Sequence, residues 1–96
     1  MSERPHFIVH NQNDTVGVVV VEESTAGKEL VGWIMDGDET IRIRAKSDIP
    51  LGHKVAIKAM AAGDTVIKYE HDIGRASEDI EAGDYVHAHN IKTKRW

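Results

Sequence analysis

The sequence contains no cysteine, only two prolines and few aromatic side chains, which make up 5% of its 96 residues. The absence of cysteine excludes disulfides, thiolate metal ligands and a cysteine nucleophile. The longest apolar run, Gly17 to Val21, is far shorter than the roughly 20 residues of a membrane-spanning helix. No apolar signal-peptide core follows the first residues. We therefore expect a soluble, cytoplasmic protein that does not enter a membrane.

The charge of the chain is weakly acidic, with a formal net charge of −4. This balance argues against a general nucleic-acid binder, because such proteins neutralise phosphates with excess positive charge. A chain of 96 residues has room for one small core. We expect residues 1–96 to form a single domain with a basic C-terminal tail at 91–96. Because small cores supply limited stability, we also expect dependence on a partner or a metal.

Apolar residues recur mostly with period two, in short runs broken by Gly, Asp and Asn. This pattern predicts a mainly β, compact domain with short strands and little helix. The predicted strands are 6–10, 16–22, 31–35, 40–45, 54–59, 65–69, 73–76 and 85–88. In 40–45 we expect the isoleucines to be buried and the arginines exposed. In 54–59 we expect Val55, Ile57 and Ala59 to be buried and the residues between them exposed.

One motif, apolar-x-x-Gly-x-x-Val, occurs three times, starting at Ile49, Met60 and Ile80, and a weaker fourth copy starts at Ser24. Glycine accepts the positive φ that tight turns require. We expect each copy to form a corner that begins a new strand. The unequal spacing of the copies argues against a solenoid, so the motif predicts a folded-over β structure.

The strongest candidate for chemistry is the segment Val86–Asn90, where His87 and His89 stand two residues apart. On a strand this spacing places both imidazoles on one face, where they can share a divalent metal or an anionic substrate. The alternative is a surface or interface pair that only forms hydrogen bonds. Asn90 is placed to orient a ligand or a neighbouring loop.

A second candidate is the polar tip after Gly52, where His53 can act as an acid or base and Lys54 can contact an anion. His10 forms a third polar end, and Lys68 is a further anion contact. For each of these residues a purely solvated role is the alternative. The sequence contains no nucleophile elbow, phosphate-binding glycine loop or dinucleotide fingerprint.

Several of these segments together resemble the SAF domain of the altronate and galactarate dehydratase family. The resemblance is carried by residues 48–56, 66–69, 73–76 and 86–90, with the first polar end and strand around 10–20. One difference is Glu70, where the family usually has glycine. The resemblance implies a β-clip (SAF-like) fold, a larger catalytic (beta) subunit that carries most of the active site, and an iron-type divalent metal bound mostly by that partner.

Within the family the chain is most similar to a free-standing small (alpha) subunit of a lyase that eliminates sulfite from (2R)-3-sulfolactate to give pyruvate. The implied substrate is a small anionic 2-hydroxy acid. We expect the candidate residues to share one polar end: His53, His87 and His89 as catalytic residues, His10, Lys54, Lys68 and Asn90 as substrate-binding residues, and His87 and His89 as candidate metal ligands.

Three other functions stay open. The first is the small subunit of a sugar-acid dehydratase of the altronate or galactarate type. The second is a non-catalytic SAF interaction module that docks through the basic tail and Trp96. The third is a small-molecule-binding β domain with the same fold and no partner.

Overall fold

Short strands dominate the computed structural model, which describes residues 4–22, 24–69 and 71–92. The strands are β1 (Phe7–Val9), β2 (Val16–Val19), β3 (Glu29–Ile34), β4 (Glu39–Arg44), β5 (Lys54–Ala56), β6 (Thr65–Lys68), β7 (His71–Ala76), β8 (Tyr85–Val86) and β9 (Ile91–Lys92). These described residues form no helix, so none of them belongs to a helix that could cross a membrane. The prediction of a mainly β chain is confirmed. Strand β9 was not predicted, and it occupies the first two residues of the expected tail.

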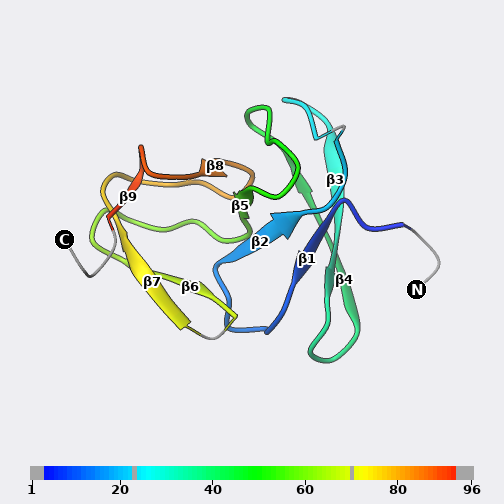
Figure 1. Cartoon of the computed structure of the whole chain (residues 1–96), viewed down its shortest axis with the longest axis horizontal. Helices are drawn as coiled ribbons and strands as arrows, with labels where there is room; N and C mark the ends of the chain where they lie inside the picture. The colour runs from blue at the N-terminus through cyan, green and yellow to red at the C-terminus, as the bar shows by residue number, and fades with distance from the viewer. Residues whose placement is uncertain (1–3, 23, 70, 93–96) are drawn as a thin grey trace.

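The strands form two sheets, one of six strands in the order β4-β3-β1-β2-β5-β8 and one of three in the order β6-β7-β9. Strands β1 and β3 run parallel, and the other paired neighbours run antiparallel. Figure 1 shows β3 and β4 on one side of the molecule and β6, β7 and β9 on the other, with β2 and β5 between them. Strand β5 therefore lies in the interior.

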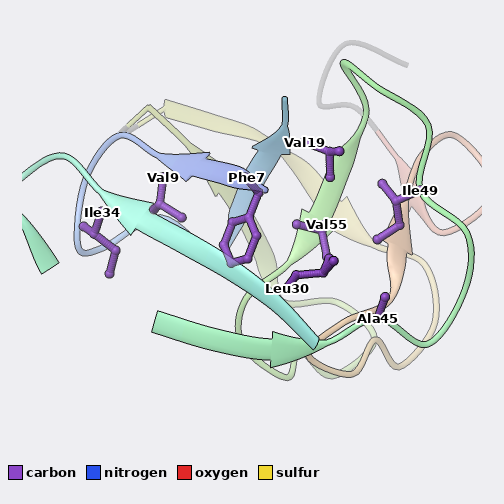
Figure 2. Packing of buried hydrophobic residues seen from close by; sticks show 8 residues of the cluster. All are labelled: Phe7, Val9, Val19, Leu30, Ile34, Ala45, Ile49 and Val55. Carbon is purple, nitrogen blue, oxygen red and sulfur yellow. The ribbon is translucent and has the colours of Figure 1, made fainter. Parts of the chain in front are cut away.

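The buried apolar side chains form two clusters. The first core cluster consists of Phe7, Val9, Val19, Leu30, Ile34, Ala45, Ile49 and Val55, and Figure 2 shows the Phe7 ring lying between Val9 on one side and Val55 on the other. The second core cluster consists of Val16, Ala56, Met60, Val66, Ala76, Ile80 and Val86. A side chain at Gly32 would overlap the Phe7 ring, so this glycine makes room for the one phenylalanine of the chain.

Strand β5 contacts both core clusters, which corrects one prediction. Val55 belongs to the first cluster and Ala56 to the second, so both are buried. The strand ends at Ala56, and Ala59 is exposed. Alternation of buried and exposed residues requires one face in water, and β5 has apolar neighbours on both faces. The alternation predicted for 40–45 is present, with the arginines exposed, but its isoleucines pack against the first cluster and are only partly buried.

The repeated glycine motif forms four corners of one kind. Gly27, Gly52, Gly63 and Gly83 have φ of 87°, 86°, 93° and 95°. In each copy the residue after the glycine donates its backbone N–H to the carbonyl three residues earlier, at 3.0 Å from His53 to Pro50 and at similar distances in the others. The first residue of every copy is buried, including Ser24 in the weakest one. The prediction of corners is confirmed for all four copies.

The chain leaves the β8 ladder at Val86, earlier than predicted. The backbone N–H of His87 donates to Asn90 Oδ1 at 2.9 Å, and Asn90 Nδ2 donates to the carbonyl of Tyr85 at 2.8 Å. The side chain of Asn90 thereby closes a turn over residues 87–90. The expectation that His87 and His89 stand on a strand was wrong, because this turn replaces ladder hydrogen bonds. Glu70 and Trp96 lie outside the described residues.

Candidate functional site

His53 directly precedes β5 and His87 directly follows β8, and the pairing of these two strands brings the two histidines together. In the antiparallel β5–β8 pair, Val55 lies opposite Tyr85 and Lys54 opposite Val86. One further step along this register places His53 opposite His87, and their ring centroids are 5.2 Å apart. Directly opposed residues on one face of an antiparallel pair are close neighbours. The register therefore explains why these two imidazoles adjoin.

Tyr85 joins this pair from the same face of β8. Its hydroxyl lies 2.7 Å from His53 Nδ1. Its ring stacks on His87, with centroids 5.6 Å apart and an interplanar angle of 15°, and it lies 5.6 Å from the ring of His89. We call His53, Tyr85, His87 and His89 the imidazole–phenol cluster. His53 and Tyr85 are half-buried, whereas His87 and His89 are exposed.

Asn90 binds the backbone of two members of this cluster, Tyr85 and His87, and is only 4% exposed. Both ends of its carboxamide bind backbone groups of the turn, as described above. A buried amide with satisfied backbone partners stabilises the conformation around it. Asn90 therefore holds the turn that carries His87 and His89. Its role in substrate binding stays a prediction.

The remaining candidates gather on the other face of β5. Lys54 follows His53 directly, and successive residues of a strand point to opposite faces. Partial burial, followed by the nearby positive charge of Lys68, lowers the pKa of Lys54 below its usual 10.5. Lys68 Nζ lies 5.1 Å from the centroid of the Tyr69 ring, and His10 packs edge-on against that ring at 5.0 Å. We call His10, Lys54, Lys68 and Tyr69 the cationic cluster.

A buried carboxylate fixes the position of Tyr69 in this second group. Asp14 is 0% exposed, and its Oδ2 accepts the backbone N–H groups of Asn11 at 3.2 Å and Tyr69 at 3.0 Å. Tyr69 has a φ of 53°, a left-handed conformation that costs free energy in a residue with a side chain. The hydrogen bond to Asp14 helps to hold Tyr69 in this conformation beside His10.

The expectation of one shared polar end was wrong for part of the set. The structure brings together His53, His87, His89 and Asn90. It separates them from His10, because β1 runs antiparallel to β2 and its last residues approach the Val16 end. His53 lies at the opposite end of β2, where its carbonyl accepts the N–H of Val19. The register of the paired strands and the alternating direction of side chains along a strand therefore divide the candidate residues into two sites.

The residues that the structure describes do not form a complete metal site. Among them, no three His, Asp or Glu side chains are grouped so that they could hold one ion. One nitrogen of His53 is already engaged by the Tyr85 hydroxyl. A divalent metal usually needs three or more protein ligands in a catalytic site. The ligand roles of His87 and His89 stay a prediction that requires further ligands from another chain.

Two site residues were missed by sequence reasoning, Tyr85 and Tyr69. Tyr85 stands two residues before His87, so the strand predicted over 85–88 already placed its ring on the same face as His87. That signal was present in the sequence. The contact between Tyr69 and His10 depends on a left-handed residue and on a hydrogen bond across 55 positions, for which no local pattern exists.

Comparison with known proteins gives one family and two groups of relatives. The model of the altronate/galactarate dehydratase SAF domain matches residues 5–94. The (2R)-sulfolactate sulfo-lyase subunit alpha of Chromohalobacter salexigens is 54% identical over 90 residues, which cover 94% of this chain and 96% of that protein. The subunit of the same name from Paracoccus pantotrophus is 57% identical over 63 residues, which cover 66% of this chain and 94% of that protein. The altronate dehydratase of Bacillus subtilis is 43% identical over 53 residues, which cover 55% of this chain but 11% of that protein.

Proposed function

Because the chain belongs to the altronate/galactarate dehydratase SAF domain family, we propose that it is the small (alpha) subunit of a lyase that eliminates sulfite from (2R)-3-sulfolactate. The observation that carries this proposal is the 54% identity to a sulfo-lyase subunit alpha across 96% of that protein. The match to altronate dehydratase is lower and covers a small part of a much longer chain. Both the identity and the length support the sulfo-lyase.

The proposed reaction needs groups that accept and donate protons near neutral pH. A base removes the proton from C2, next to the carboxylate. The electron pair forms the C2=C3 double bond, the C3–S bond breaks, and sulfite leaves with the electrons of that bond. The resulting enol becomes pyruvate by losing its hydroxyl proton and gaining a proton at C3. Imidazole is the side chain best suited to such transfers, and the imidazole–phenol cluster contains three.

The open surface around this cluster supports the proposal of a larger (beta) subunit. His87 and His89 are exposed, whereas an elimination site works best when water is excluded. The relatives are named as subunits alpha, which implies a second subunit in those enzymes. In this proposal the larger subunit covers the cluster, completes the active site and holds the iron-type divalent metal. The proposed compartment is the cytoplasm, with which the absence of cysteine is compatible.

The cationic cluster is proposed to bind an anionic group, since two ammonium groups lie half-buried in it. Carboxylates and sulfonates form charge-assisted hydrogen bonds with such groups. Lys54 and His53 point to opposite faces of one strand. The substrate-binding roles of His10, Lys54 and Lys68 stay predictions, and their proposed ligand is an anionic group.

Replacement of Lys54 tests whether the positive charges of the cationic cluster lower the free energy of unfolding. Because the folded protein holds this proton less tightly than the unfolded chain, stability is expected to rise as pH increases from the depressed pKa of Lys54 towards 10.5. Lys54→Met is expected to stabilise the protein at pH 7 by about 0.5 kcal/mol, the size of an interaction between partly exposed charges, and to flatten that rise. Thermal unfolding at pH 7 and pH 10 measures both effects.

The control for this variant is Lys58→Met, which removes an exposed lysine just after β5 and is expected to give no gain. Sulfate at millimolar concentration is expected to raise the unfolding temperature of the wild type more than that of Lys54→Met. A Lys54→Met variant that is less stable than the wild type at pH 7, or that keeps the full sulfate effect, would contradict an anion site at the cationic cluster.

The experiment that tests the proposed function compares two substrates on the complex purified with its larger subunit. We expect sulfite and pyruvate from (2R)-3-sulfolactate, and no loss of water from altronate. Dehydration of altronate without sulfite release would replace the proposal with the sugar-acid dehydratase, which the altronate dehydratase relatives support. Binding of the larger subunit with no change in its turnover would instead favour a non-catalytic interaction module.

A further inference from the structure

We propose that Tyr85 is a positioning residue that sets the tautomer of His53, so that neutral His53 presents Nε2–H to the substrate. The starting observation is the short distance of 2.7 Å between the Tyr85 hydroxyl and His53 Nδ1. The catalytic part of this inference rests on the proposed function. Its structural part concerns this chain alone.

The geometry of the two strands brings the phenol to one ring nitrogen. Tyr85 lies opposite Val55, so His53 is its diagonal neighbour on the same face of the pair, a distance that long aromatic side chains span. The Tyr85 ring packs against the first core cluster and stacks on His87. Because apolar contacts restrain the ring, its hydroxyl is aimed at Nδ1 by the fold.

The direction of this hydrogen bond determines what His53 can do. A phenol O–H is a good donor and its oxygen a weaker acceptor, whereas the nitrogen of neutral imidazole that carries no proton is a good acceptor. In the arrangement that we propose, the Tyr85 O–H donates to Nδ1 of neutral His53, and the imidazole proton resides on Nε2.

This tautomer separates the roles of the histidines. A nitrogen that carries hydrogen cannot accept the C2 proton, so neutral His53 acts as a donor through Nε2. The fitting acceptor for that donor is the leaving group, a sulfonate whose oxygens gain negative charge as the C3–S bond breaks. Nε2–H of neutral His53 donates a hydrogen bond to a sulfonate oxygen as this charge develops, and the imidazole keeps its proton. The C3–S electron pair leaves with sulfite, which departs as the dianion, and the proton removed from C2 goes to a different base.

The base that removes the C2 proton is therefore a residue other than Tyr85 and His53. Within the described part of the chain, the Tyr85 hydroxyl is hydrogen-bonded to His53 and not to His87 or His89. Each of them is exposed and free to present either ring nitrogen to a substrate held by the larger subunit. The geometry therefore points to His53 as the group that assists departure of sulfite.

The variant Tyr85→Phe tests this inference, because it keeps the stacked ring and removes only the hydroxyl. The first readout is ¹⁵N NMR of the full chain labelled at histidine. Wild-type His53 is expected to show a protonated Nε2 and an unprotonated Nδ1 at pH 8, and Tyr85→Phe is expected to show a mixture of tautomers. In the complex, kcat for sulfite release is expected to fall about 2- to 10-fold, the effect of one hydrogen bond, with KM little changed.

The matched control is Trp33→Phe. Trp33 Nε1 donates to Asp38 Oδ1, also at 2.7 Å, and β3 lies on the far side of the six-stranded sheet from β8. This variant loses an aromatic hydrogen bond of the same length, and the His53 signals and kcat are expected to stay as in the wild type.

Two results would overturn the inference: wild-type His53 with its proton on Nδ1, or an identical tautomer ratio in the wild type and Tyr85→Phe. If Tyr85→Phe changes the tautomer ratio of His53 as expected but the wild-type complex releases no sulfite, positioning by Tyr85 is supported and the proposed function is contradicted. The two ideas can therefore fail separately.

Discussion

Replacing His53 with alanine in the assembled complex is expected to lower kcat for sulfite release by about 10²- to 10³-fold, the usual contribution of a donor aimed at developing negative charge. The reason is chemical, because the variant loses the ring that lies 2.7 Å from the Tyr85 hydroxyl and 5.2 Å from the centroid of His87. Initial rates of sulfite formation at saturating substrate measure the effect.

The control for this variant is His71→Ala. His71 is exposed at the start of β7, in the smaller sheet, and its replacement is expected to leave kcat unchanged. Both complexes are first compared by size-exclusion chromatography, so that a loss of assembly is recognised. A His53→Ala complex that assembles normally and turns over within about threefold of the wild type would contradict a catalytic role for His53.

The second large effect concerns stability, and it is expected for Gly83→Ala. Gly83 has a φ of 95°, and a Cβ there would overlap the backbone carbonyl of Arg44. The backbone cannot move away easily, because the Gly83 carbonyl accepts the N–H of Lys46 and its own N–H donates to Ala56. We expect a loss of about 2–5 kcal/mol, combining about 1–2 kcal/mol for the left-handed conformation with about 1–3 kcal/mol for steric overlap.

Gly63→Ala separates these two contributions. Gly63 occupies the same position in another copy of the motif and has a φ of 93°, but a Cβ there would meet nothing within 4 Å. It is expected to lose only the conformational part, about 1–2 kcal/mol. Denaturant unfolding of the three proteins measures the difference. Equal losses for the two variants would show that close packing against Arg44 does not determine the requirement for Gly83.

Much of the fold was predictable because its corners are local. The glycine motif needs only a residue that accepts positive φ and an apolar residue three positions before it. Both can be recognised within a segment of seven residues. The burial of both Val55 and Ala56 could not be predicted, since it depends on β6 and β7 folding back over the sheet. Strand β9 was missed because two residues, Ile91 and Lys92, carry too little periodicity to indicate a strand.

The candidate site was predictable in its members but not in its arrangement. The imidazoles at 53, 87 and 89 were recognised from residue type and spacing. Their meeting point is set by the register of β5 and β8, which are separated by about 30 positions. The same register turns Lys54 away from His53, so neighbours in the sequence belong to different sites. The turn closed by Asn90 explains why His87 and His89 leave the strand.

The most direct test of the central claim is a titration of the purified larger subunit with this chain, in the presence of (2R)-3-sulfolactate. The proposed function predicts little sulfite release by either protein alone, and a rate that rises with added chain until it saturates, with sulfite and pyruvate formed in equal amounts. The same titration with a His53→Ala, His87→Ala double variant is expected to saturate at a rate at least 100-fold lower. Sulfite release by the larger subunit that is unaffected by this chain, or that is restored fully by the double variant, would contradict the claim that this chain supplies proton-transfer groups to the active site.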